Sequence, residues 1–315
     1  MPDVLTLGET MVMVAPVEAD GGISLDSRFA LRPGGAESNV AIHLSRLGHA
    51  TEWVGQLGDD PFGAIILDYL RATGVDVGRV VVDPTAPTGV YFKDSDGQHT
   101  DVYYYRRGSA ASRMSPDLVD RLVDEPPAVL HLTGVTAALS AGCQALVERL
   151  VIRRGLPATR VTFDVNYRPA LWPVVDAAPV LLGLAASADV VFVGLDEART
   201  LWGCRDAQAV RDLLPGPAEI VVKNGAVEAT SIGTEGTVSV PAPRVDVVEL
   251  VGAGDAFAAG WLSGLLRGVS ALERLQLGHA LAGHVLRTTF DDIELPADLR
   301  HGLPRTAPTT TSGAG

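Results

Sequence analysis

Short apolar segments alternate with amphipathic segments along most of this chain of 315 residues. Strands that alternate with helices form a parallel sheet covered on both faces, because each connection has to cross the sheet. The sequence therefore predicts an α/β fold. From residue 128 the predicted order is a strand at 128–132, a helix at 140–154, a strand at 160–165, a helix near 177–186, a strand at 189–193, a helix at 195–202 and a strand at 218–223.

A segment in the first third of the chain interrupts this alternation. Residues 80–82, 88–93 and 99–105 have the composition of antiparallel strands, with residues 94–97 as the hairpin turn. We expect a small separate sheet here that acts as a lid. The chain has no internal repeat and no clear linker, so residues 1–300 are predicted to form a single domain, with residues 301–315 as a disordered tail.

Composition narrows the kinds of partner. The formal net charge is -13, with no basic run longer than two arginines, which disfavours a nucleic acid or an anionic membrane surface. No apolar run approaches the roughly 20 residues of a membrane span. The two cysteines, Cys143 and Cys204, make no disulfide framework. We therefore expect a cytoplasmic protein that binds small molecules.

Two glycine turns precede predicted helices, at residues 34–39 and 251–255. Small residues at a helix start leave backbone N–H groups free to bind an anion such as phosphate. Asp255 lies in the first turn of the later helix, where it suits the acceptance of a hydroxyl proton. The alternative is that both turns are ordinary helix starts with capping residues.

Polar residues follow several of the predicted parallel strands, the end of a sheet where ligands bind in such folds. Alternation in an extended chain predicts that Asp164, Asn166 and Arg168 point to one side. Glu197 follows the next strand, Lys223 and Gly225 follow another, and we expect residues 245–250 to lead into the later glycine turn in the same way. Each residue alone is equally consistent with a cap or a surface charge.

The lid segment contains Tyr91, Tyr104 and Arg106. If its last strand continues to residue 106, Tyr104 and Arg106 share a face. Arg106 and Arg168 are then suited to hold a small anion, because a guanidinium group binds a carboxylate with two hydrogen bonds. The alternative to a binding role is that the tyrosines are present because they favour β-strands and that the arginine is exposed to solvent.

Together these motifs resemble those of the ribokinase-type (PfkB) carbohydrate kinases, over about residues 3–296. The resemblance lies in Gly34-Gly35-Ala36-Glu37-Ser38-Asn39, in Val54 to Gly63, and in Gly252-Ala253-Gly254-Asp255. Within the family, Gly89-Val90-Tyr91, Tyr104 to Ala110 and Asp164-Val165-Asn166-Tyr167-Arg168 look most like the 2-keto-3-deoxygluconate kinase subfamily.

The resemblance implies a ribokinase-like three-layer α/β/α sandwich with a mostly parallel sheet, and a β lid formed by about residues 11–30 and 88–106. It implies ATP and Mg²⁺ as cofactors and leaves open whether a monovalent cation is also needed. We also expect the protein to form a homo-oligomer. The implied roles are catalysis for Asp255 and for the amides of Gly252, Ala253 and Gly254; sugar binding for Gly34, Gly35, Asn39, Tyr91, Tyr104, Arg106 and Arg168; nucleotide binding for Asn166, Lys223 and Gly225; and positioning of Mg²⁺ through water for Glu197.

The sequence departs from the family pattern at three places. Gly194 stands where an Asn usually precedes the Glu of the magnesium motif, Glu228 replaces a glycine of the nucleotide loop, and Glu249-Leu250 replace an Asp-Thr pair before the later glycine turn. These departures concern metal positioning and the phosphoryl donor.

The predicted activity is ATP-dependent phosphorylation of the primary hydroxyl of a keto-deoxy sugar acid, 2-keto-3-deoxygluconate, to its 6-phosphate. One alternative is a kinase of the same family for a neutral sugar such as fructose or ribose. Another is a sugar-binding sensor without turnover. A nicotinamide oxidoreductase is disfavoured, because the glycine turn lies far too late in the chain and Phe257 occupies its third glycine position.

Overall fold

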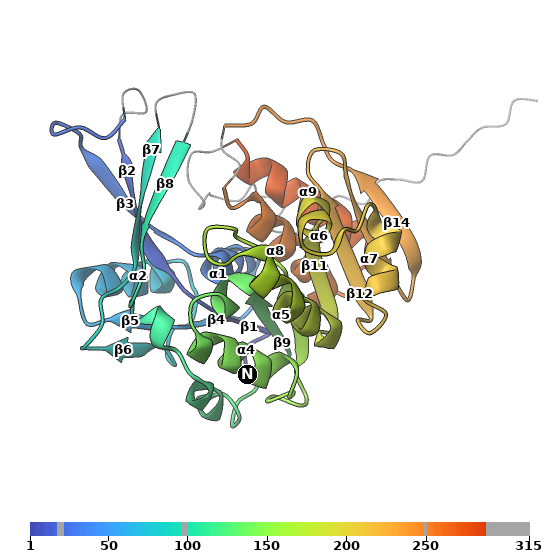
Figure 1. Ribbon diagram of the computed structural model, residues 1–315, viewed down its shortest axis with the longest axis horizontal. Helices are drawn as coiled ribbons and strands as arrows, with labels where there is room; N and C mark the ends of the chain where they lie inside the picture. The colour runs from blue at the N-terminus through green and yellow to red at the C-terminus, as the bar shows by residue number, and fades with distance from the viewer. Residues whose placement is uncertain (18–21, 96–99, 249–250, 288–315) are drawn as a thin grey trace, which may run out of the picture.

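The computed structural model describes residues 1–17, 22–95, 100–248 and 251–287. Within these ranges the chain forms one large sheet, a separate four-stranded sheet and a two-stranded pair, with helices packed on both faces of the large sheet (Figure 1). The prediction of a three-layer α/β/α sandwich with a second small sheet is confirmed. The predicted tail at 301–315 and the hairpin residues 96–97 lie outside the described ranges.

The large sheet is mostly parallel. Its strands, in spatial order, are β14 (Gly236–Pro241), β13 (Glu228–Gly233), β12 (Glu219–Asn224), β11 (Val190–Gly194), β10 (Arg160–Asp164), β9 (Val129–Thr133), β1 (Val4–Leu7) and β4 (Thr51–Val54). Neighbours from β12 to β4 pair in parallel, and β13 pairs antiparallel with both β12 and β14. The carboxyl ends of the parallel strands therefore lie along one edge.

Helices form the two outer layers. They are α1 (Ala36–Arg46), α2 (Pro61–Ala72), α3 (Gly134–Ala137), α4 (Ala141–Val151), α5 (Val174–Ser187), α6 (Leu195–Trp202), α7 (Ala207–Leu213), α8 (Ala253–Leu266) and α9 (Ala271–Val285), with 3₁₀ turns at Ala111–Arg113 and Pro116–Arg121. Successive strand residues point to opposite faces. Val4 of β1 accordingly packs with α1, α8 and α9, and its neighbour Leu5 packs with α4, α5 and α6. Both faces of the sheet are therefore buried.

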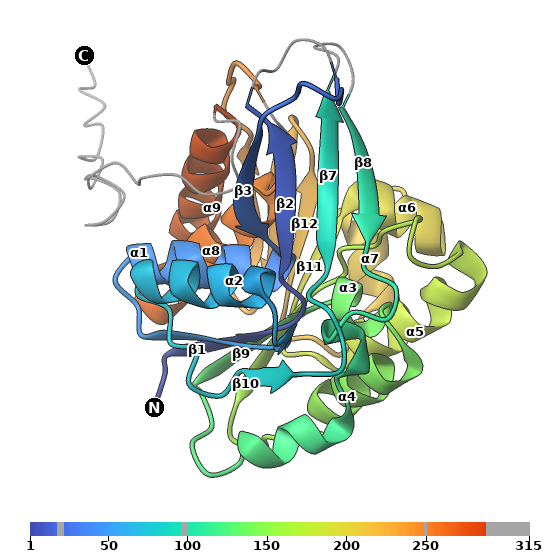
Figure 2. The same ribbon diagram turned by 90° about the vertical axis from the view of Figure 1, so that its left-hand side faces the viewer.

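The smaller four-stranded sheet is built from β3 (Phe29–Gly34), β2 (Met11–Pro16), β7 (Val90–Ser95) and β8 (Thr100–Tyr105). It stands above the large sheet in Figure 2, and we call it the lid sheet. Helix α2 packs against its β2 strand through an apolar cluster that includes Val12, Val14 and Ile66. The two-stranded pair consists of β5 (Gln56–Gly58), which contacts α2, and β6 (Val81–Asp83). These strands pair in parallel and apart from the lid sheet, so the expectation of an antiparallel strand at 80–82 is wrong. That the lid sheet closes over a ligand stays a prediction.

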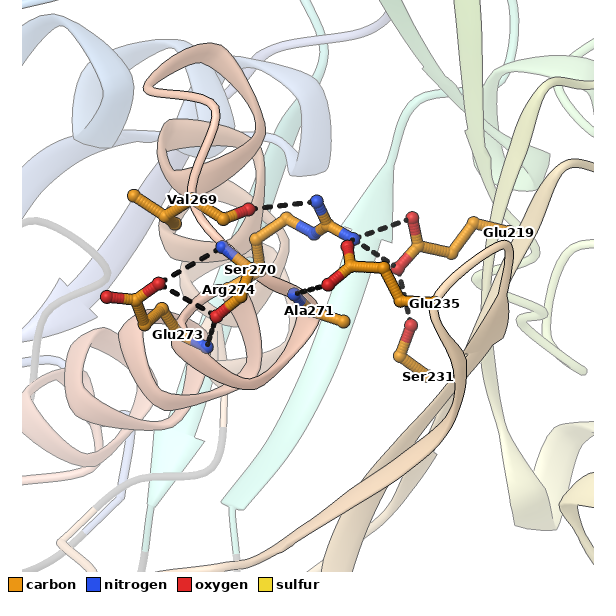
Figure 3. Close-up of polar contacts among 8 residues, drawn as sticks. All are labelled: Glu219, Ser231, Glu235, Val269, Ser270, Ala271, Glu273 and Arg274. Atoms are coloured by element: carbon orange, nitrogen blue, oxygen red, sulfur yellow. Dashed lines mark hydrogen bonds and ion pairs between the residues drawn. The ribbon is translucent and has the colours of Figure 1, made fainter.

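A buried charge cluster holds α9 to the amino end of β12. Arg274 donates hydrogen bonds to Glu219 at 3.0 Å and to Glu235, in the turn between β13 and β14, at 2.9 Å (Figure 3). Its guanidinium carbon lies 5.1 Å from the centre of the Trp261 ring. This cluster lies at the start of β12, whereas the polar residues predicted for the site follow the other ends of the strands. It therefore supports the scaffold only.

One predicted strand is absent. Residues 242–248 form no strand, although we expected residues 245–250 to enter the later glycine turn as one. Strand β14 ends at Pro241, and Pro243 lacks the N–H group that would let the ladder continue past it. Among the described residues, no helix is long and apolar enough to cross a membrane.

Candidate active site

A cavity of about 580 Å³ lies between the lid sheet and the carboxyl ends of the parallel strands. Lid strands β2, β7 and β8 contribute residues to it, as do the segments that follow β10, β11 and β12 and the start of α8. The structure thus brings together nearly all residues predicted for the site. Those that line the cavity are Gly34, Gly35, Asn39, Tyr91, Tyr104, Arg106, Asn166, Arg168, Glu197, Lys223, Gly225, Gly252, Gly254 and Asp255. Ala253 does not line it but lies in the same turn.

Asp255 lies in the first turn of α8 and faces the cavity. Its two carboxylate oxygens accept hydrogen bonds from Asn39 of α1 at 3.0 Å and from Asn166, after β10, at 3.5 Å. Burial raises the pKa of Asp255 to about 7, although the Asn39 hydrogen bond and the Arg168 charge act in the opposite direction. A carboxylate with a pKa near neutrality is well suited to act as a general base.

The turn before Asp255 presents main-chain donors. Gly252 has a φ of 81°, the left-handed conformation that favours glycine, and α8 begins directly after it. The amides of Gly252, Ala253 and Gly254 donate to no other residue in the described part of the chain. The N–H groups at a helix start and the helix dipole together favour an anion at this position. Lys223 adds a positive charge, since its Nζ lies 3.8 Å from where a Cβ on Gly254 would be.

Asp164 is the counter-ion of Lys223. The Lys223 Nζ donates to Asp164 Oδ2 at 2.6 Å, and the Asp164 side chain is buried. Burial lowers the pKa of Lys223, but the Asp164 and Glu197 carboxylates more than offset this, so the net shift is upward and the lysine stays charged. The prediction that Asp164, Asn166 and Arg168 share one side of an extended segment is wrong. Strand β10 ends at Asp164, and Asn166 has a left-handed φ of 39°.

Glu197 lies in the first turn of α6 and is held by two backbone amides. Its oxygens accept from the Gly194 amide at 2.8 Å and from the Tyr167 amide at 3.0 Å, and Arg168 lies 3.9 Å away. Burial and the neighbouring Asp164 raise the pKa of Glu197. These two hydrogen bonds fix the position of the Glu197 carboxylate without the Asn that Gly194 replaces.

The residues near Glu197 fit a hydrated magnesium ion. Asp164 Oδ1 and Asn166 Oδ1 are buried oxygens with no hydrogen-bond partner among the described residues. Mg²⁺ prefers oxygen ligands and usually keeps several of its waters. Within the described ranges, no cluster of three or more His, Cys, Asp or Glu residues is arranged to bind a metal directly. The oxygens of Glu197, Asp164 and Asn166 therefore suit a magnesium ion that is bound through its water molecules and through phosphate.

The prediction that Arg106 and Arg168 together hold a small anion requires both guanidinium groups to be available to a ligand. Arg106 is already paired within the protein. It forms a buried ion pair with Glu9, whose other oxygen accepts from Ser109 Oγ at 2.9 Å. Its guanidinium carbon lies 5.5 Å from the centre of the Tyr104 ring, and that ring stacks on Tyr91 at 5.6 Å. Arg168 is far more exposed, at 55% of its side chain. Both arginines line the cavity, but Arg106 is buried in an ion pair whereas Arg168 is largely exposed.

Close packing explains the glycines of the N-terminal turn. A Cβ on Gly34 would collide with the Tyr91 hydroxyl, and a Cβ on Gly35 would collide with the Glu9 carbonyl oxygen. Both positions thus require glycine so that α1 can begin directly beneath the lid sheet.

Several lining residues were not predicted: Glu9, Met11, Lys93, Val102 and Val135. Glu9 follows β1, so the rule that ligands bind beyond strand ends would have identified it. The others lie on the lid or after β9 and have no distinguishing pattern. Of the departures from the family motifs, Glu228 is the first residue of β13 and pairs with Asn224, while Glu249 and Leu250 lie outside the described residues.

Comparison with known proteins places this geometry in a family. The model of the pfkB family carbohydrate kinases matches residues 1–297. A 2-dehydro-3-deoxygluconokinase from Thermoproteus tenax is 35% identical over 94% of this chain and 92% of its own length. One from Bacillus subtilis is 35% identical over 96% and 92%. The crystal structure of a PfkB protein from Polaromonas sp. JS666 superposes with a TM-score of 0.83 at 34% identity, covering 91% of this chain and 96% of that one. This chain therefore belongs to the pfkB family of carbohydrate kinases.

Proposed function

We propose that this kinase transfers the γ-phosphate of ATP to the primary hydroxyl of 2-keto-3-deoxygluconate and releases the 6-phosphate. The observation that carries the proposal is that Asp255 and the glycines of the turn before it, Gly252 and Gly254, share one cavity with Arg106 and Arg168. A phosphoryl-transfer centre and two cationic side chains suit a sugar that bears a carboxylate. The names of the two relatives above, which match along almost their whole length, support the same substrate.

Asp255 accepts the proton of the sugar hydroxyl as that oxygen attacks phosphorus. Asn39 and Asn166 hold the carboxylate in place through its two oxygens. The amides of Gly252, Ala253 and Gly254, with Lys223, stabilise the charge of the phosphoryl group in transit. Mg²⁺, when bound, neutralises charge on the ATP phosphates, and Glu197, Asp164 and Asn166 would hold its water shell. Dependence on a monovalent cation and assembly into a homo-oligomer stay predictions.

The substrate is tested by ADP release with a panel of sugars. We expect 2-keto-3-deoxygluconate to have the highest kcat/KM, well above fructose and ribose. A preference for the neutral sugars would support the alternative, for which the pairing of Arg106 with Glu9 is the favouring observation. Stabilisation by a sugar with no ADP release from any member of the panel would instead indicate a sensor.

The pH dependence of turnover follows from the pKa of Asp255. Only the ionised carboxylate can accept the proton, and burial raises its pKa to about 7. Protonation therefore removes activity as the pH falls. We expect kcat, measured with saturating sugar and ATP so that affinity does not contribute, to fall about tenfold for each pH unit below about 7. A kcat that is constant from pH 8 to pH 5.5 would contradict the role of Asp255 as base.

A further inference from the structure

Glu9 is an acidic residue in the cavity wall that takes no part in the phosphoryl-transfer step described above. It lies in the connection between β1 of the large sheet and β2 of the lid sheet. Only 2% of the residue is exposed, yet it lines the cavity. One carboxylate oxygen accepts from Ser109, and the other is paired with Arg106. Before a sugar binds, Arg106 thus already has an anionic partner.

A sugar acid brings a second anion to this arginine. Two carboxylates and one guanidinium cannot be buried together without cost, because one negative charge remains uncompensated where water is excluded. Arg168 does not remove the conflict, since its side chain is exposed and lies beside another carboxylate, that of Glu197. Either the sugar carboxylate stays away from Arg106, or Glu9 gives up its charge.

Resting on the proposed function, we propose that Glu9 is the resident counter-ion of Arg106, that the carboxylate of the sugar acid displaces it, and that Glu9 takes up one proton as this happens. The proton comes from solvent and binds the carboxylate oxygen that Arg106 leaves. The other oxygen keeps its hydrogen bond from Ser109, and no bond within the sugar is made or broken. A neutral sugar cannot make this exchange.

Once Arg106 turns away, the burial of Glu9 favours its neutral form. Four groups from three parts of the chain lie against Glu9. They are Arg106 and Ser109 after β8, Glu37 on α1 and Cys143 on α4. Burial raises the pKa of Glu9, and Arg106 and Ser109 act against it. Glu37 is fully buried with a raised pKa, and the pKa of Cys143 is raised to about 11, mainly by burial. Arg106 is the only cation among these four groups and the one that acts on Glu9, although Lys93 of β7 also lines the cavity.

Proton uptake can be measured by titration calorimetry of 2-keto-3-deoxygluconate without ATP, in two buffers with different enthalpies of ionisation. The Asp255→Asn protein is used, because Asp255 itself titrates near pH 7. We expect uptake of about one proton for each sugar acid bound, and a Kd that rises with pH by about tenfold per unit over the range in which one proton is taken up. Fructose, if it binds, should show neither effect.

The variant that tests the assignment is Glu9→Gln in the same background, which keeps the shape and an oxygen that accepts from Ser109. It should bind the sugar acid without proton uptake and with a Kd that no longer depends on pH. Glu52→Gln is the matched control. Glu52 is also a buried glutamate, held by a hydrogen bond from Arg79 at 2.7 Å, but it lies on β4 outside the cavity, and proton uptake should persist.

The outcomes separate the two proposals. Binding of the sugar acid without proton uptake, or with uptake that survives Glu9→Gln, would overturn the role of Glu9 and leave the proposed substrate intact. Failure of the sugar acid to bind, with tight binding of fructose, would overturn both. If Glu9→Gln does not fold, the buffer comparison on the protein with Glu9 present still decides whether uptake occurs.

Discussion

Asp255→Asn is expected to lower kcat by about 10³-fold, because it removes the group that accepts the hydroxyl proton. Asparagine has nearly the same shape, and its amide oxygen can still accept from Asn39, which donates to the carboxylate at 3.0 Å. Affinity for the sugar should therefore change by no more than a few fold. ADP release measures the first effect, and calorimetry without ATP measures the second.

The matched control is Asp206→Asn. Asp206 also lies at a helix start, where it caps α7 by accepting from the Ala209 amide at 2.8 Å, but it does not line the cavity. Asparagine caps a helix about as well as aspartate, so both kcat and stability should remain unchanged. Near-normal turnover of Asp255→Asn would remove this residue from the mechanism. A loss of sugar binding equal to the loss of rate would indicate a structural role instead.

The fold could be predicted largely because its elements are local patterns. Short segments rich in Val, Leu, Ile and Phe became β9, β10, β11 and β12, and the glycine turn at 252–254 became the start of α8. The failure at 245–248 is informative. The valines there suggested a strand, but a strand also needs a partner strand, and residues 242–248 pair with none.

The site could be predicted as a set of residues but not as a set of pairs. Strand ends and glycine turns identified Asp255, Asn166, Lys223 and Arg106, which the structure brings into one cavity. That Lys223 is neutralised by Asp164, 59 positions earlier, depends on β10 and β12 lying on either side of β11. The pairing of Arg106 with Glu9 depends in the same way on how the lid sheet meets β1. Both ion pairs depend on which strands are neighbours in the folded protein, and the sequence patterns did not predict the strand order.

Arg106→Ala is expected to have the second-largest effect, on the KM for the sugar acid. The change removes a guanidinium that is only 13% exposed and leaves Glu9 buried without its cation. Loss of one partner from a desolvated charge pair at a binding site costs about 2–5 kcal/mol, so we expect KM to rise at least about 30-fold, with a smaller change in kcat. The free energy of unfolding should fall by about 3 kcal/mol for the same reason.

The double variant Arg106→Ala/Glu9→Gln separates these two effects. Removing the unpaired charge should restore most of the stability, as measured by denaturant unfolding, because glutamine can remain hydrogen-bonded to Ser109 without a counter-ion. It should not restore KM, because the carboxylate of the sugar still lacks its partner. Arg113→Ala is the control, since Arg113 lies close by in the chain and pairs with Asp83 at 3.4 Å outside the cavity. If the double variant recovered both stability and KM, Arg106 would serve only to neutralise Glu9, and Arg168 alone would have to bind the acid.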